Sequence, residues 1–118
     1  MIKIILPGNP PSTQHIYMHK GHFVYMTKEG KDAKKRFQDE FLVQYGTKPL
    51  SGDLKLTVGY FWGDRRIRDI DNFSKLWMDA GTGYVWVDDS QIQELTLKKF
   101  YDKKFPRVEI EINETNAK

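Results

Sequence analysis

The residues from 53 to 62, DLKLTVGYFW, place an apolar side chain at every second position. Leu54, Leu56, Val58 and Tyr60 carry the alternation. Because successive side chains of a strand point to opposite faces of its sheet, these four residues would share one face. The pattern therefore predicts a strand with a buried side, and the rest of the chain has to supply the layer that covers it.

Two helices and several further strands are predicted around this strand. One helix is expected from about Lys28 to Tyr45, with Thr27 as its N-cap and Gly46 at its end. A shorter helix covers NFSKLWMDA, with Asp71 as its cap. The other predicted strands are MIKIIL, a hairpin made of HIYM and HFVYM, YVWV, IQELTLKKFY and RVEIEIN. The expected class is α+β, with a mixed, mostly antiparallel sheet and two helices packed on it.

Length and composition limit the class of protein. With 118 residues, we expect a single domain over 1–118. The chain has no cysteine, which excludes disulfides and a thiolate zinc site. It shows neither a signal-peptide pattern nor an apolar run of about 18 residues, so we expect a cytoplasmic protein without a membrane span. The net charge of +3 suits either an ordinary basic protein or one that binds nucleic acid.

The segment from 64 to 76, DRRIRDIDNFSKL, places carboxylates among arginines. Asp69 and Asp71 are one residue apart, so both could point into one cleft if the backbone there is extended. Lys75 follows Asp71 by four residues, which would place the two on one helix face. Carboxylate oxygens are the hard ligands that Mg²⁺ prefers.

A second acidic pair, Asp88 and Asp89, follows the predicted strand YVWV. That strand would bring the pair back to the same end of the sheet as Asp69 and Asp71. Because neighbouring strand residues point to opposite faces, only one member of the pair should enter the site. The sequence thus offers three carboxylates for a magnesium site, with one of the two neighbouring aspartates as the third.

Each part of this arrangement also has a simpler structural interpretation. An aspartate at a helix start is usually a cap, an Asp–Lys pair four residues apart is usually a weak surface ion pair, and two aspartates after a strand usually form a turn. The neighbouring arginines could form ion pairs, or hold phosphates while the carboxylates hold a metal. A D-x-D motif also occurs in glycosyltransferases, but no nucleotide-binding loop accompanies it here. The joint occurrence favours metal-dependent cleavage of a phosphodiester.

The motifs DRRIRDIDNFSK and VDDSQI, with MDA between them, resemble the RusA family of Holliday junction resolvases, which are phage- and prophage-associated endonucleases. PPS, Tyr17 and TKEGK fit the family's less specific N-terminal part. The resemblance implies that Asp69, Asp71, Asp89 and Lys75 are catalytic, and that the three aspartates bind Mg²⁺, for which Mn²⁺ could substitute. Asp88 matches a further acidic position. The chain departs from the pattern at TQHIY and at the glycine after DA.

The resemblance also implies partners. Family members act as homodimers on four-way DNA junctions in recombination and repair, which implies a bacterial or phage-infected cell. A two-fold axis would place two sites on opposing strands, so that the nicks are symmetric. The basic residues expected to contact phosphates are Arg65, Arg66, Arg68, Lys31, Lys34 and Lys35, with Lys98, Lys99, Lys103 and Lys104 as an extension. The aromatic residues that could pack the junction centre are Tyr17, Phe23 and Tyr25.

Two other functions remain open at this point. One is a non-catalytic, basic DNA-binding module in which the acidic cluster is structural. The other is a magnesium-dependent nuclease that prefers other branched DNA.

Overall fold

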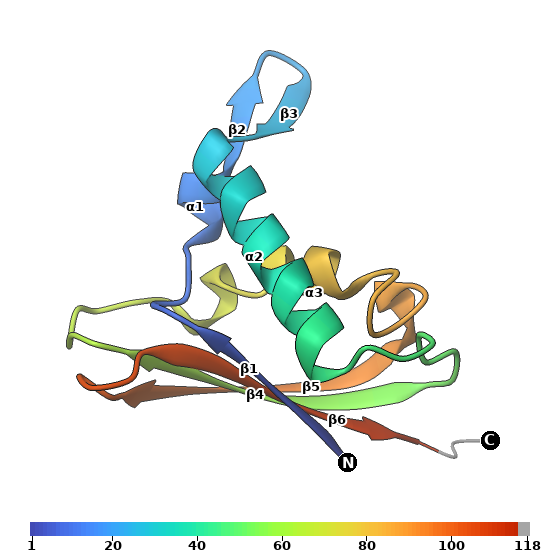
Figure 1. The fold of residues 1–118 in the computed structure, drawn as a ribbon. Helices are drawn as coiled ribbons and strands as arrows, with labels where there is room; N and C mark the ends of the chain where they lie inside the picture. The colour runs from blue at the N-terminus through green and yellow to red at the C-terminus, as the bar shows by residue number, and fades with distance from the viewer. Residues whose placement is uncertain (116–118) are drawn as a thin grey trace.

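The computed structural model describes residues 1–115, except for the side chains of Gln14 and His15. It contains a four-stranded sheet of order β1-β6-β4-β5 and a separate hairpin of β2 and β3 (Figure 1). The strands are β1 (Ile2–Pro7), β2 (Tyr17–Lys20), β3 (Phe23–Met26), β4 (Leu54–Trp62), β5 (Ile92–Tyr101) and β6 (Arg107–Glu114). The helices are α1 (Thr13–Ile16), α2 (Lys28–Gln44) and α3 (Lys75–Gly81), with two 3₁₀ turns, η1 (Ile70–Asn72) and η2 (Asp89–Gln91).

The sheet is mixed. Strand β6 pairs antiparallel with both β1 and β4, whereas β4 and β5 are parallel. Strands β5 and β6 are consecutive in the chain, but β4 lies between them. Helices α2 and α3 lie on one face of the sheet, and the hairpin projects from the N-terminal end of α2 (Figure 1). The predicted α+β class, with a mostly antiparallel sheet and two helices on it, is confirmed.

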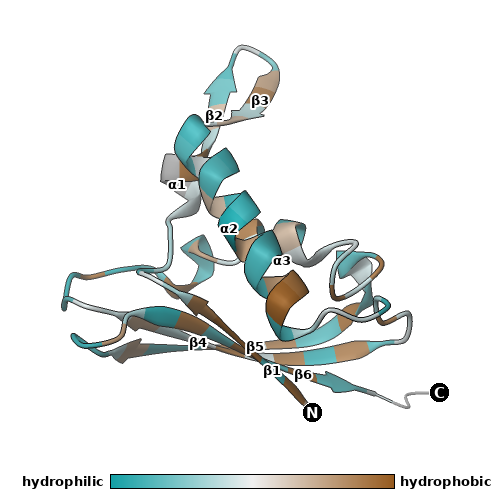
Figure 2. Cartoon of the chain, viewed as in Figure 1, coloured by the Kyte–Doolittle hydropathy of each residue, from teal (hydrophilic) through white to brown (hydrophobic). Residues whose placement is uncertain are grey.

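The core lies between the sheet and the helices, and the alternation in β4 is confirmed. Leu54, Leu56, Val58 and Tyr60 are all buried. The neighbouring strands β1 and β6 add isoleucines, leucine and valine to the same face, and α2 buries Ala33, Phe37 and Phe41 against it. The solvent-facing side of α2 is hydrophilic along most of its length (Figure 2). Burial of one large aliphatic or aromatic side chain stabilises a fold by roughly 1.5–3 kcal/mol.

The ends of α2 are those that the sequence predicts. The Thr27 hydroxyl accepts a 3.1 Å hydrogen bond from the Gly30 amide, as an N-cap does. At the other end Gly46 has φ of 66°, the left-handed conformation that ends many helices. No helix among residues 1–115 is long and apolar enough to cross a membrane.

Three local predictions are wrong. Residues 84–87 do not form a strand: Tyr84 and Val85 donate to the Gly81 carbonyl in a turn, and Trp86 makes only isolated bridges. A short apolar run can be buried in a turn as well as in a strand, and Trp86 is fully buried here. Asp71 does not cap the second helix, because it lies in η1 and α3 begins only at Lys75. Helix α1 stands where the first strand of the hairpin was expected to begin.

Candidate active site

The connection from η1 into α3, and α3 itself, are anchored to β4 by three contacts. The Phe73 ring lies 4.8 Å from that of Trp62, and the Ser74 and Tyr60 hydroxyls are 2.8 Å apart. Trp77 Nε1 donates to the Tyr60 hydroxyl at 3.0 Å inside the core. These contacts bury one side of the segment and fix its path. The other side is left in solvent.

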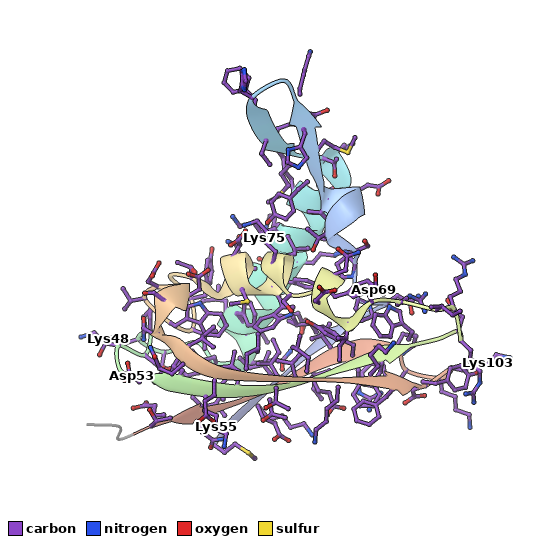
Figure 3. All side chains as sticks on the ribbon, turned by 180° about the vertical axis from the view of Figure 1, so that it is seen from behind. Lys48, Asp53, Lys55, Asp69, Lys75 and Lys103 are labelled. Carbon is purple, nitrogen blue, oxygen red and sulfur yellow. The ribbon has the colours of Figure 1, made fainter. Side chains whose placement is uncertain are left out.

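Asp69, Asp71 and Lys75 occupy that exposed side. Asp69 has extended backbone angles just before η1, and Asp71 lies within η1. Lys75 is the first residue of α3. Asp71 and Lys75 therefore belong to different elements, and the expectation that they stack one helical turn apart is wrong. Asp69 and Lys75 both lie on the helix-bearing side of the sheet (Figure 3).

The second acidic pair is divided by η2. Asp88 is the N-cap of this turn, and its Oδ2 accepts from the Ser90 amide at 3.1 Å. The Asp88 amide donates to Gln91 Oε1 at 2.8 Å, and Gln91 Nε2 donates to the carbonyls of Leu50 and Gly52 at 2.8 and 2.9 Å. Hydrogen bonding to Ser90 lowers the pKa of Asp88. Strand alternation does not distinguish Asp88 from Asp89, because neither lies in a strand. The two differ because the Asp88 side chain caps η2 and that of Asp89 does not.

The six aspartates between residues 64 and 90 thus fall into two groups. The carboxylates of Asp64, Asp79 and Asp88 have partners, which are the Arg68 side chain at 2.8 Å, the Lys75 side chain at 3.5 Å and the Ser90 backbone amide at 3.1 Å. Among the described residues, the carboxylates of Asp69, Asp71 and Asp89 accept no hydrogen bond and form no ion pair. The carboxylates without a partner are those expected to bind metal.

Lys75 is held from two sides. Its Nζ lies 3.5 Å from Asp79 Oδ2, one helical turn further along α3. The same oxygen accepts a 2.5 Å hydrogen bond from the hydroxyl of Tyr17, and Lys75 Nζ lies 5.1 Å from the Tyr17 ring centroid. The ammonium is therefore placed by an acid and an aromatic face, while more than half of its side-chain surface stays exposed.

Asp69 opens onto a groove of about 990 Å³ between the N-terminal loop, α2 and the loop after β4. Arg36, Arg66 and Arg68 line it, together with the carboxylates of Glu29, Asp32 and Asp64. A hydrogen bond links η1 to the N-terminal loop, because Asn72 Nδ2 donates to Ser12 Oγ at 3.0 Å. Lys31, Lys34 and Lys35 line a different hollow, with Met26 and Tyr84, so Arg36 is the basic residue of α2 beside Asp69.

The arginines of the loop differ in what they contact. Arg68 forms a bidentate ion pair with Asp64, at 2.8 and 3.1 Å, and its guanidinium lies over the Trp62 ring. Arg65 lies 4.0 Å from the Tyr101 ring centroid, and Arg66 faces the groove. Lys99 Nζ donates to the Arg68 carbonyl at 2.7 Å, so this lysine braces the loop. Lys103 lies far from Lys75, at another end of the sheet (Figure 3).

Comparison with known proteins adds to this geometry. The family model described as endodeoxyribonuclease RusA matches residues 7–113. The chain belongs to the RusA family. It is 32% identical to crossover junction endodeoxyribonuclease RusA of Escherichia coli K12 over 116 residues, which is 94% of this chain and 92% of that protein. The same figures hold for the protein of that name from Enterobacteria phage 82.

A shorter match links the chain to the uncharacterized protein YqaN of Bacillus subtilis, 43% identical over 49 residues. The family resemblance noted in the sequence is confirmed, and with it the prediction of a DNA endonuclease. The relatives' names specify a crossover junction as what they act on.

The metal expected for a RusA family nuclease fits the site in its donor chemistry. Three carboxylates without other partners are suitable ligands for a hard divalent cation. Among the side chains that the structure describes, however, no group of three or more acidic or histidine residues is close enough together to hold a metal ion. The three carboxylate donors are therefore present in one chain, but they do not lie together as a metal site.

Sequence reasoning gave no role to Asp79, which holds Lys75, or to Gln91, which holds the turn that carries Asp89. Tyr17, considered there for packing the junction centre, donates a hydrogen bond to Asp79. Arg36, on the basic helix expected to contact phosphates, lines the groove that Asp69 also lines. Asp79 lies in the MDA motif, and Tyr17 in the less specific N-terminal part of the resemblance. Nothing local in the sequence pairs them, since they lie on elements far apart in the chain.

Proposed function

We propose that this chain is a magnesium-dependent endodeoxyribonuclease that cuts four-way DNA junctions. Asp69, Asp71 and Asp89 are its metal ligands, with Mn²⁺ as a possible substitute for Mg²⁺. Lys75 is the cationic group at the scissile phosphate. The observation that carries the proposal is the division of the six aspartates of residues 64–90, because the three without partners coincide with the three expected ligands.

Each of the chain's own groups has a defined task in this proposal. A bound divalent cation would neutralise phosphate charge and acidify a water. Lys75, paired with Asp79, donates to a phosphate oxygen or to the leaving oxygen, where negative charge increases. Arg66 and Arg36 hold the DNA backbone in the groove that Asp69 also lines. Asp88 and Gln91 keep the η2 turn in shape.

We further propose that the enzyme works as a homodimer in the cytoplasm of a bacterial or phage-infected cell. Four-way junctions have two-fold symmetry, so two copies related by such an axis would meet equivalent strands. Paired nicks on opposing strands would then leave two ligatable duplexes.

The test is incubation of a labelled four-way junction and a linear duplex of the same sequence with the protein in Mg²⁺. We expect symmetric nicks in the junction only, none with EDTA, and none with Asp69→Asn or Asp71→Asn, both of which should still bind the junction. Glu111→Gln is the matched control, because Glu111 alternates with the buried Ile110 and Ile112 of β6 and so lies on the face of the sheet away from the helices.

Each alternative predicts a different result. A non-catalytic binding module would shift the junction in a gel without cutting it. A nuclease for other branched DNA would cut flaps or forks faster than four-way junctions. Cutting by Asp71→Asn at the wild-type rate would remove this residue from the site.

A further inference from the structure

The β2–β3 hairpin has one face that none of the other described residues covers. In its antiparallel register Met18 lies opposite Tyr25, and Lys20 lies opposite Phe23. Directly opposed residues of such a pair share a face, and alternate residues of a strand do too. Met18, Lys20, Phe23 and Tyr25 therefore form one surface, which we call the hairpin face.

The hairpin face is apolar, aromatic and solvent-exposed. Phe23 is 77% exposed, Tyr25 49% and Met18 42%. The opposite face behaves differently at its base, where Tyr17 and Met26 pack against the core. The hairpin projects away from the sheet and helices, and its β3 strand carries apolar residues into solvent (Figures 1 and 2). An exposed aromatic cluster of this kind marks an interaction surface.

The charge around the hairpin face indicates the partner. The first 28 residues contain no aspartate or glutamate, and the hairpin itself carries Lys20, His19 and His22. Cationic and aromatic side chains without a carboxylate suit a ligand that combines phosphates with flat base faces. A second copy of the same hairpin would instead bring like charges together.

The base of the hairpin is connected to the candidate active site. The Thr27 amide donates to the Ile16 carbonyl at 2.7 Å, which closes the hairpin at its base. Tyr17, the first residue of β2, is hydrogen-bonded to Asp79, whose carboxylate also contacts Lys75. The direction in which the hairpin projects is thus fixed relative to Lys75.

We propose that the hairpin face binds DNA at the branch point, with Phe23 and Tyr25 against base faces exposed there and Lys20 at a phosphate. Bases at a branch can be unstacked from one neighbour, whereas those within a duplex are stacked on both sides. The hairpin face therefore contributes selectivity for branched over linear DNA. This inference rests on the proposed function in taking DNA as the substrate.

The test measures binding in EDTA, so that no cutting occurs. A four-way junction with 2-aminopurine beside the branch point is titrated with wild type, Phe23→Ala and Phe105→Ala. Phe105 is the control, because it is an exposed aromatic, at 44%, in the turn between β5 and β6. We expect Phe23→Ala to lose roughly tenfold in junction affinity, the size of one base stack, together with the change in 2-aminopurine fluorescence on binding. Linear-duplex affinity should change less than about twofold, and Phe105→Ala should match wild type.

A second variant separates aromatic stacking from apolar packing. Phe23→Leu keeps an apolar side chain without an aromatic ring, so it should also lose the 2-aminopurine signal. Sedimentation velocity without DNA tests whether a second copy of the chain covers the hairpin face instead. If Phe23→Ala turns a dimer into a monomer, the hairpin face is a contact between copies and the proposal is overturned. Unchanged junction affinity and signal in Phe23→Ala would overturn it as well. If the wild type does not cut in Mg²⁺ but the binding results hold, the proposed function fails and this inference stands.

Discussion

The Tyr17 hydroxyl donates a 2.5 Å hydrogen bond to Oδ2 of Asp79, a residue 62 positions further along the chain. Burial, followed by the hydrogen bond to Asp79 and its negative charge, raises the pKa of Tyr17, so the phenol stays protonated and donates at any physiological pH. The same oxygen faces Lys75 Nζ at 3.5 Å. One hydrogen bond therefore joins the hairpin, α3 and the lysine expected at the scissile phosphate.

Replacement of Tyr17 by phenylalanine tests this connection. Tyr17→Phe removes the donor and keeps the ring, so we expect the free energy of unfolding to fall by about 1–2 kcal/mol. If Asp79 then holds Lys75 less firmly, single-turnover nicking should slow while junction affinity changes little. Urea unfolding and rapid-quench kinetics measure the two effects. Tyr84→Phe is the matched control, because the half-buried Tyr84 has no side-chain hydrogen bond among the described residues.

We expect Asp88 to have a structural role and Asp89 a role in cutting. Asp88→Ala removes the cap of η2, so we expect a lower urea midpoint with cutting retained at a reduced rate. Asp89→Asn leaves every contact of η2 in place, so we expect wild-type stability and junction binding without cutting. Unfolding curves and nicking assays on both variants decide the point, and the reverse outcome would make Asp88 the ligand.

The close contact between α3 and the turn that follows it predicts a sensitive glycine. A Cβ on Gly81 would meet the Trp86 ring, with Cη2 at 2.7 Å and Cζ2 closer still. Gly81→Ala should therefore destabilise the fold by roughly 1–3 kcal/mol through overpacking. Gly52→Ala is the control, because nothing lies within 4 Å of its added Cβ. Thermal unfolding of the two variants measures the difference, and equal midpoints would contradict the packing seen here.

The Asp64–Arg68 pair should give the loop after β4 a defined acid dependence. Hydrogen bonding to Arg68 lowers the pKa of Asp64 to about 2 from 3.8. A lowered pKa means that the pair stabilises the loop above pH 3.8 and that this contribution is lost as pH falls through about 2. Carboxyl ¹³C NMR should find the midpoint of Asp64 near 2, and Arg68→Ala should return it toward 3.8. If the pKa of Asp64 in the wild type were at its ordinary value, the pair with Arg68 would not be formed in solution.

The position of Arg36 beside Asp69 predicts an order among the basic residues of α2. Arg36 faces the groove, whereas Lys35 lies on another side of the helix and pairs with Asp39 at 3.3 Å. Arg36→Ala should weaken junction binding more than Lys35→Ala does. Loss of one phosphate contact also lowers the slope of log affinity against log salt by about 0.9. Binding measured in EDTA over a range of salt concentrations tests both statements, and equal losses would remove the groove from the DNA path.

Secondary structure was predictable where the signal is local. The alternation in β4 and the Thr27 cap of α2 depend on residues only a few positions apart, and both are confirmed. YVWV was predicted incorrectly because a strand and a buried turn both place apolar residues inside, and only the contacts of Trp86 distinguish them. Likewise, an aspartate before a helix resembles a cap whether or not the helix begins beside it, as Asp71 shows.

The sequence by itself determined the family, the α+β class and the acidic residues worth testing, because these depend on motifs and periodicity along the chain. Only the tertiary structure decided which carboxylates have partners. Arg68 neutralises Asp64, the η2 turn uses Asp88, and Tyr17 with Lys75 engages Asp79. These assignments depend on distances between elements, and the Tyr17–Asp79 bond spans 62 positions that no local pattern connects. Within the described part of the chain, Asp69, Asp71 and Asp89 remain without partners because the fold gives their neighbours other contacts.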